Sequence, residues 1–290
     1  MMDNARDTQG LTGEKRGALY EEHVLLGASF AQGELGIPTT VAYASAQAAD
    51  SAVREGCVLA DATGMRVILS SGAPLEGFQQ AAFASESLSV GESAFGPVLL
   101  GDGSLASIPL LARSGDDELL AFDMSPRASV MAAWLSFVSS IEQDGFAPYQ
   151  GLDVTDVSTR LVPLVLWGHT APAVLGDYVG GADALPAPGS VASLMLDGRI
   201  SCVCIATELA GENCYLLMVP PNLARVIWRS LLSFQSVSPV GLAQLWAAAR
   251  DAAPWLDALA TTDKLSLSRS DLESWGIVRD GSDFIGGRAL

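Results

Sequence analysis

The chain has 290 residues, of which 49% are hydrophobic and 17% are charged, and its formal net charge at neutral pH is −17. This composition excludes a disordered chain and predicts a globular protein with a substantial core. The strong negative charge argues against nucleic acid as a partner, because phosphates require a basic surface, and against anionic membranes.

The apolar stretches are too short to span a membrane. The longest lie around Leu161–Trp167 and Ile200–Ala206, far below the length that a bilayer requires. The first 17 residues mix charges with Gly and Thr and lack the apolar core of a signal peptide. We therefore expect a cytoplasmic protein. The four cysteines are expected to be buried apolar residues and not a disulfide framework or a zinc site.

The sequence of the N-terminal part predicts a tail followed by two helices. Residues 1–18 form the tail, Tyr20–Ser29 is helix-like, and a Gly/Pro-rich link follows through Pro38. The alanine-rich residues 44–56 predict a helix that ends before Cys57.

A strand, a helix and a β meander come next. The β-branched alternation of Met65–Ser70 predicts a strand, and Pro74 suits the first position of a helix over Leu75–Ala84. Three strands with tight turns and then a helix are expected at Pro97–Leu100, Leu105–Ala112, Glu118–Asp123 and Ala128–Gln143.

The second half repeats this plan. Two strands and a short helix are predicted at Asp153–Ser158, Leu161–Trp167 and Pro172–Val179. A second meander and two helices are predicted at Ser190–Leu196, Arg199–Thr207, Cys214–Val219, Asn222–Phe234 and Gly241–Arg250. The repeat indicates an α+β protein with two related units, residues 19–150 and residues 151–290, packed on each other.

Three sequence blocks resemble, in the same order, motifs of the glycine-cleavage T-protein (aminomethyltransferase) family. Residues 282–290 contain Asp-Phe-Ile-Gly followed by Ala-Leu, as in the family's signature. Residues 19–28 are similar to its Leu-Tyr-x-Glu-His-x-x-Leu-Gly-Ala opening, and residues 52–65 to its Ala-Val-Arg-Glu block ending in Met65. The family moves one-carbon units onto tetrahydrofolate.

The resemblance implies a fold as well as a function. T-proteins have two intertwined α+β units with antiparallel sheets around a central folate channel, followed by a C-terminal β-barrel. The chain ends at Leu290, where that barrel would begin. On this resemblance the barrel is expected to be absent or to be supplied by a partner chain.

The positions that carry the family's chemistry differ here. The family's Gly-Gly-x-x-Asp-Asp segment provides an aspartate beside the reactive nitrogens of folate, and residues 103–108 place Ser107 and Ile108 at the acidic positions. A hydroxyl cannot carry the negative charge of that aspartate at neutral pH. Leu216 stands where the family has the glutamate that binds the pterin ring. No residue is therefore assigned as catalytic.

Two residues match family positions near folate. Met65 corresponds to a methionine and Trp275 to the tryptophan ahead of the C-terminal signature. With Ser107 and Leu216 they form the predicted cofactor-binding set. Asp102, at a glycine turn, and His169, in a loop, are interpreted as structural residues.

Two functions are compatible with the sequence. The first is a tetrahydrofolate-dependent aminomethyl or methyl transferase-like protein with altered active-site residues. The alternative is a non-catalytic ligand-binding protein, or a subunit of a larger complex, whose channel holds folate or another small molecule.

Overall fold

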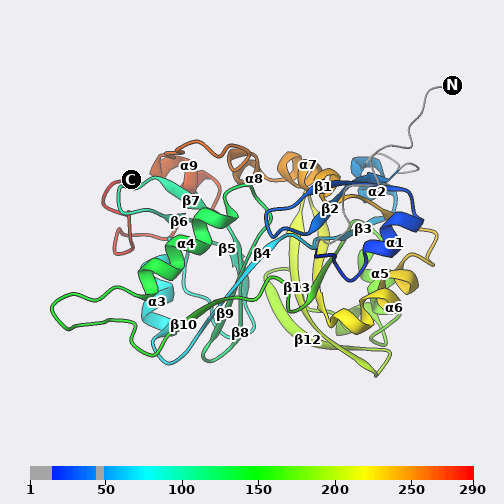
Figure 1. Cartoon of the computed structure of the whole chain (residues 1–290), viewed down its shortest axis with the longest axis horizontal. Helices are drawn as coiled ribbons and strands as arrows, with labels where there is room; N and C mark the ends of the chain where they lie inside the picture. Colours follow the sequence, from blue (N-terminus) through cyan, green and yellow to red (C-terminus); the bar gives the residue numbers. More distant parts are fainter. Residues whose placement is uncertain (1–14, 44–48) are drawn as a thin grey trace.

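The computed structural model describes residues 15–43 and 49–290. It has two lobes, each built on an antiparallel sheet (Figure 1). The predicted α+β class with antiparallel sheets is confirmed. None of the helices in the described part of the chain is long and apolar enough to cross a membrane.

The first lobe is built on a five-stranded sheet. In spatial order its strands are β10 (Asp153–Asp156), β4 (Arg66–Ser71), β9 (Glu118–Asp123), β8 (Leu110–Gly115) and β5 (Ser93–Phe95). Because side chains alternate along a strand, each face has its own core. Ile68, Leu119 and Ala121 pack with the helices α3 (Leu75–Ala82) and α4 (Ala128–Ser139), whereas Val67 and Phe122 point to the other lobe.

The second lobe is built on a six-stranded sheet. Its order is β12 (Ser190–Leu196), β13 (Ile200–Leu209), β14 (Glu212–Val219), β11 (Val162–Trp167), β3 (Cys57–Asp61) and β15 (Val237–Pro239), of which only β15 pairs in parallel with its neighbour among the described strands. Leu166 and Leu217 pack with the helices α5 (Ala171–Gly176) and α6 (Pro221–Leu231). Val165 and Leu216, on the alternate face, join Val67 and Phe122 in one core cluster between the two sheets.

The lobes exchange strands. β3, from the first half of the chain, lies in the six-stranded sheet, and β10, from the second half, lies in the five-stranded sheet. The units are therefore intertwined, because each sheet contains strands from both sides of the boundary between residues 150 and 151. The division into units 19–150 and 151–290 stays a prediction about how the chain folds.

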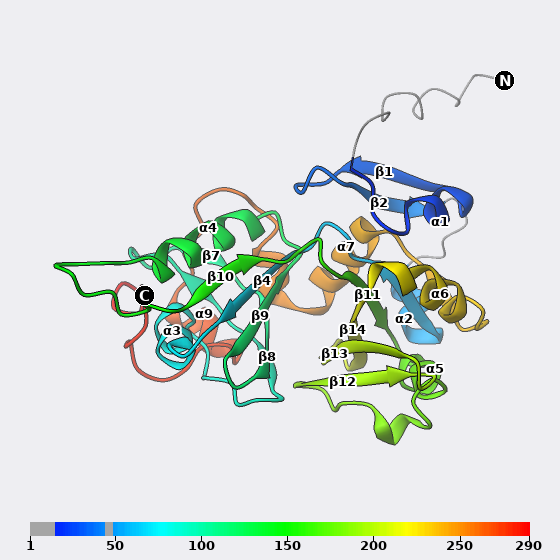
Figure 2. The same ribbon diagram turned by 60° about the horizontal axis from the view of Figure 1, so that its bottom comes forward.

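The N-terminal region contains a hairpin that the sequence did not predict. After the short helix α1 (Tyr20–Leu25), β1 (Ala28–Gln32) pairs with β2 (Pro38–Tyr43), where a helix end and a loop had been expected. The expectation of a link through Pro38 is wrong, because Pro38 begins a strand of a two-stranded sheet, where a missing N–H is tolerated. The hairpin lies to one side of both lobes (Figure 2). The helix predicted at 44–56 is α2 (Ala49–Glu55), and residues 44–48 lie outside the described residues.

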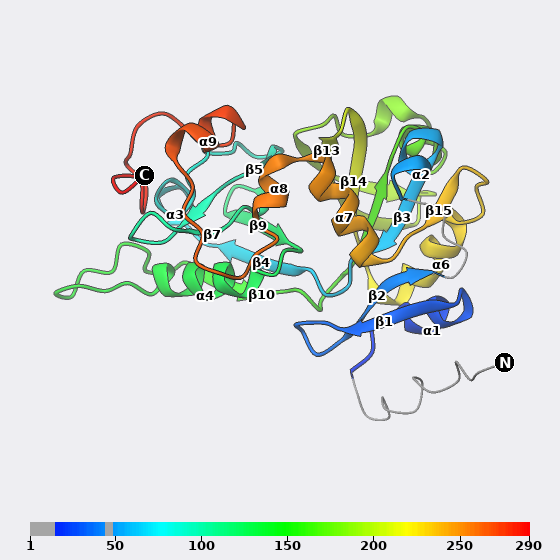
Figure 3. The ribbon, with the colours of Figure 1, turned by 90° about the horizontal axis from the view of Figure 1, so that it is seen from above.

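The C-terminal residues 242–290 return from the second lobe to the first. α7 (Leu242–Ala252), α8 (Pro254–Ala258) and α9 (Arg269–Ser274) follow one another across the molecule (Figure 3). Two short strands of the first lobe, β6 (Val98–Leu99) and β7 (Leu105–Ser107), form the remaining small sheet, and a 3₁₀ turn lies at Ala182–Ala184.

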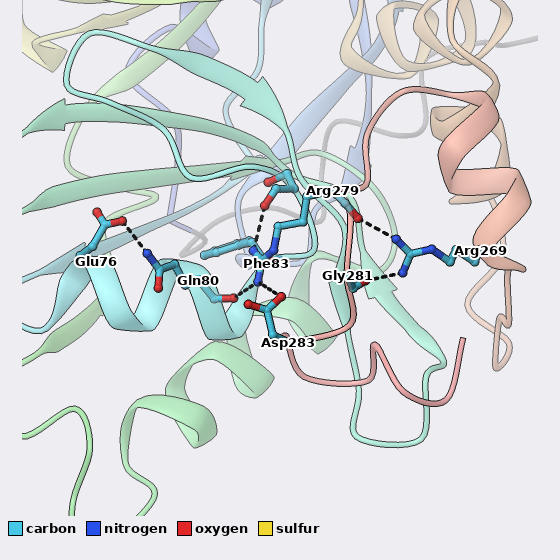
Figure 4. A network of polar contacts seen from close by, with 8 residues as sticks. Glu76, Gln80, Phe83, Arg269, Arg279, Gly281 and Asp283 are labelled. Carbon is cyan, nitrogen blue, oxygen red and sulfur yellow. Dashed lines mark hydrogen bonds and ion pairs between the residues drawn. The ribbon is translucent and has the colours of Figure 1, made fainter.

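Arginine side chains attach the last residues to α3 (Figure 4). Arg279 Nη2 donates to the Gln80 carbonyl oxygen at 2.7 Å, and its Nη1 donates to the Phe83 carbonyl oxygen at 3.1 Å. Helix C-terminal carbonyls lack partners within the helix, and a cation there is favourable. The Arg279 guanidinium also lies over the Phe284 ring, 5.0 Å from its centroid. Phe284 of the Asp-Phe-Ile-Gly signature is thereby held against the first lobe.

Replacement of Arg279 by Ala is expected to lower the free energy of unfolding by about 1–3 kcal/mol, because the carbonyl oxygens of Gln80, Phe83 and Ser85 lose a charged donor. The C-terminal segment should detach first, which limited chymotrypsin digestion would detect as faster cleavage after Phe284. Arg288→Ala is the matched control, since Arg288 is exposed in the same segment. Equal cleavage rates in the two variants would contradict this role of Arg279.

Candidate ligand-binding site

The two sheets leave an apolar cavity between their facing sides. Its volume is about 70 Å³, room for a small group and below the size of a whole small-molecule pocket. We call this space the inner cavity. Its lining consists of Met65, Phe95, Ile108, Leu110, Phe122, Asp123, Met124, Val165, Trp167, Thr207, Leu209, Cys214, Leu216, Leu245, Trp246, Ala249 and Leu256. Both lobes and α7 therefore contribute to one site.

A second hollow, of about 340 Å³, lies between the β1–β2 hairpin, the start of α4 and α7. We call it the outer groove. Its lining consists of Gln32, Gly33, Glu34, Thr39, Gly64, Asp123, Met124, Ser125, Pro126, Ala128, Leu242 and Trp246. Asp123, Met124 and Trp246 line both spaces. The inner cavity and the outer groove therefore meet at these three residues.

Among the described residues that line the inner cavity, Asp123 carries the only carboxyl group, and none is Lys, Arg or His. It ends β9 and is 4% exposed. Its Oδ2 accepts a hydrogen bond from Ser107 Oγ at 2.5 Å, and its Oδ1 accepts one from the Ser125 N–H at 2.8 Å. Burial raises the pKa of Asp123, the hydrogen bonds from Ser107 and Ser125 partly offset this, and the charge of Glu34 adds to the rise. The carboxyl group is therefore poised to change protonation state when its surroundings change.

Arg127 holds the strand behind Asp123. Its guanidinium donates only to main-chain carbonyl oxygens, namely those of Ala106 at 2.9 Å, Leu105, Thr261 at 3.1 Å and Asp263 at 2.7 Å. Burial lowers the pKa of Arg127, and the charge of Asp123 acts in the opposite direction. Because Leu105 and Ala106 precede Ser107 in β7, these bonds hold Ser107 beside the carboxyl group.

A buried polar network positions Met65. Asp61 Oδ2 accepts from His23 Nε2 at 2.8 Å, and Asp61 Oδ1 accepts from the N–H and the Oγ1 of Thr63 at 2.8 and 2.6 Å. The Tyr43 hydroxyl lies 2.8 Å from His23 Nδ1. The two ring nitrogens of His23 are therefore both engaged, one with Asp61 and the other with Tyr43. The network fixes the turn after β3 that places Met65 in the cavity wall.

The predicted site residues do not all come together. Met65 and Leu216 line the inner cavity. Ser107 is fully buried and reaches the cavity only through Asp123. Trp275 follows α9, is half-buried, and packs against the shared core without lining either space.

The sequence did not identify Asp123 as a site residue. The available signal was an aspartate at the end of a strand and two residues before a serine, a pattern that also occurs at turns. The other polar residues considered lie elsewhere. Exposed Asp102 pairs with Lys264 at 2.7 Å, and exposed His169 lies 3.6 Å from Glu212.

Comparison with known proteins gives a family and a fold. The sequence model of the family described as GCVT N-terminal domain matches residues 19–261. No curated protein sequence matches the chain.

The chain matches 39 chains of solved structures, among them the following two. Glycine cleavage system aminomethyltransferase T from Bartonella henselae superposes with a TM-score of 0.70 at 21% identity, over 96% of this chain and 74% of that one. At this identity the likeness shows the fold alone. A chain of the heterotetrameric sarcosine oxidase from Corynebacterium sp. U-96, in complex with pyrrole 2-carboxylate, has a TM-score of 0.44 at 15% identity, over 76% of this chain and 93% of that one.

Proposed function

Since this chain belongs to the family of the GCVT N-terminal domain, we propose that it binds a small organic molecule in the inner cavity, with Asp123 as the group that recognises it. The observation that carries this proposal is the buried Asp123 carboxyl group in an otherwise almost wholly apolar wall. A preformed apolar space with one placed polar group is typical of a ligand site.

The stability of the fold does not account for Asp123. Burying a carboxyl group costs free energy, and an apolar residue of similar size would avoid that cost. Ionisable groups with a raised pKa at a cavity wall are typical of functional sites. We therefore attribute the position of Asp123 to ligand recognition.

Tetrahydrofolate does not fit the inner cavity in the way the family resemblance implies. A pterin ring carries several N–H and C=O groups, and each one left unpaired on burial costs about 1–3 kcal/mol. Apart from Asp123, the lining offers the Thr207 hydroxyl, the Cys214 thiol and two indole N–H groups, of which that of Trp167 already donates to the Leu209 carbonyl oxygen. Leu216 replaces the carboxylate expected for the ring. No step of a reaction is therefore derived through folate.

The second candidate function is tetrahydrofolate-dependent aminomethyl or methyl transfer. It is favoured by the hydrogen bond between Ser107 and Asp123. Ser107 stands at the position of the family's acidic residue, so a carboxyl group from the neighbouring strand comes within one hydrogen bond of that position. Calorimetry with tetrahydrofolate and 5-formyl-tetrahydrofolate separates the candidates. Tight binding that Asp123→Asn abolishes would support transfer, and no heat at high micromolar ligand would reject it.

Binding in the inner cavity can be tested with the uncharged fluorophore N-phenyl-1-naphthylamine. The wild-type chain should enhance its fluorescence. Ala249→Phe fills the cavity from α7 and should weaken binding by more than about tenfold without unfolding the chain. Ala247→Phe places the same ring on the exposed side of α7 and should leave binding unchanged.

A second filling variant tests whether the effect of Ala249→Phe comes from the filled cavity or only from a change in α7. Leu216→Phe places a larger side chain in the opposite wall of the inner cavity, on β14, and should weaken binding as Ala249→Phe does. No binding to the wild-type chain, or equal binding by both filling variants and the control, would contradict the proposed site.

A further inference from the structure

The charged groups around the two spaces have one sign. The outer groove contributes Glu34, and Asp123 lies where the groove meets the inner cavity. Among the described residues that line the inner cavity and the outer groove, none is Lys, Arg or His. A ligand on this path therefore meets carboxyl groups and no cation. An anion would be repelled, and a cation would be attracted.

The nearby arginines are engaged with other groups. Arg127 directs its donors to main-chain carbonyl oxygens. Arg66 pairs with Asp156 at 2.6 Å and donates to Ser129 Oγ at 2.9 Å, while Ser129 Oγ donates to Glu34 at 2.7 Å. These arginines do not turn the path into an anion site.

Aromatic rings form much of the remaining wall. Phe95, Phe122, Trp167 and Trp246 line the inner cavity, and Trp246 also lines the outer groove. The face of an aromatic ring attracts cations, more strongly where water is excluded. Aromatic rings beside a buried carboxyl group are the surroundings in which an organic ammonium group is stabilised.

We propose, on the basis of the function proposed above, that the ligand is an organic cation: an amine or quaternary ammonium compound with an apolar body. The cationic nitrogen lies at the junction, facing Asp123 and Trp246, and the apolar body extends from there into the inner cavity and the wider outer groove. Glu34 attracts the cation at the mouth of the path. An anionic ligand, such as one carrying a free carboxylate tail, is disfavoured.

Ligand binding is coupled to the proton of Asp123. Burial and Glu34 raise the pKa of this carboxyl group in the free protein, and an arriving cation lowers it again. Arg127, the other charged group near Asp123, keeps its positive charge throughout. Binding therefore releases a proton, and affinity for the cation rises with pH up to the pKa of free Asp123. A quaternary ammonium ligand isolates this effect, because it has no proton of its own to lose.

The test compares three compounds that share one ring system: 1-naphthylmethylamine, 1-naphthylmethanol and 1-naphthoate. Calorimetry should rank the cation above the neutral alcohol and the alcohol above the anion, with about a tenfold difference in Kd at each step. Asp123→Asn should bring the affinity ratio of amine to alcohol close to one. Glu34→Gln, at an exposed position, should reduce the ratio by a smaller factor.

The outcomes separate this inference from the proposed function. Equal affinity for the alcohol and the amine, or tighter binding of the naphthoate, would overturn the inference and leave the cavity as a ligand site. An unchanged ratio in both variants would also overturn it. If none of the three compounds bound and N-phenyl-1-naphthylamine also failed to bind, the proposed function would fail as well.

Discussion

Replacement of Asp61 by Ala is expected to lower the free energy of unfolding by about 3–5 kcal/mol, the cost of removing one partner from a buried polar pair. Asp61 is 4% exposed and accepts hydrogen bonds from His23 and from two groups of Thr63. After the substitution, the buried His23 ring and the partly buried Thr63 hydroxyl lose their partner. Chemical denaturation of the variant and the wild type measures the loss.

The matched control for this prediction is Asp61→Asn. The amide keeps one oxygen that can accept from Thr63, so the loss should be clearly smaller than in Asp61→Ala. Because the turn that follows carries Met65, both variants should also weaken binding of N-phenyl-1-naphthylamine, in the same order. A loss below about 1 kcal/mol in Asp61→Ala, the size of an exposed hydrogen bond, would contradict a structural role for this network.

Replacement of Asp123 by Asn is expected to increase stability while it removes cation recognition. The folded state raises the pKa of Asp123, so the folded chain holds this proton at pH values where the unfolded chain has lost it. Wild-type stability therefore falls as pH rises from the ordinary aspartate pKa toward the raised value. Asn does not titrate and can still accept from the Ser125 N–H, while the Ser107 hydroxyl can rotate to accept from its amide.

The advantage of Asp123→Asn should therefore depend on pH. It should be small near pH 4 and reach about 1–3 kcal/mol near pH 8, as measured by urea denaturation at each pH. Asp102→Asn is the control, since Asp102 is an exposed carboxylate paired with Lys264. If Asp123→Asn were less stable than the wild type at every pH, Asp123 would be a structural residue and not a recognition group.

Most of the architecture followed from local patterns. The strands of the second meander and the long helices were predicted close to their observed positions, because their periodicity and glycine turns are local signals. In the first meander the strand predicted at Leu105–Ala112 is wrong: it is two strands, β7 and β8, that lie in different sheets, and β5 was not predicted. α4 illustrates the usual error, since it ends at Ser139 and not at Gln143. The β1–β2 hairpin was missed because its strands form a sheet of only two and depend on packing against α7 and α1.

The exchange of strands could not be read from local patterns. β3 is buried at every position, which is typical of a central strand, but nothing in its sequence says which sheet it joins. The family resemblance carried that information, because its three blocks include the parts that connect the lobes. Gly286 belongs to the C-terminal block and packs against the first lobe. Its φ is +82°, and a Cβ at this position would lie 2.5 Å from the Leu100 carbonyl oxygen, so the contact requires glycine.

The candidate site was predicted only in part. Met65 and Leu216 line the inner cavity. The carboxyl group in its wall belongs to Asp123 at the end of β9, whereas Ser107, the predicted position, ends β7. A substitution compensated by a residue on another strand cannot be seen by comparing one motif at a time. It requires the hydrogen bond between Ser107 and Asp123, which only the three-dimensional arrangement shows.

The most direct test of this account is a crystal structure of the chain with 1-naphthylmethylamine. We expect the ring in the joined space of the inner cavity and the outer groove, in contact with Met124 and Trp246, and the ammonium nitrogen within hydrogen-bond distance of Asp123. A compound bound only on the outer surface, with side chains filling the space between the sheets, would contradict the central claim.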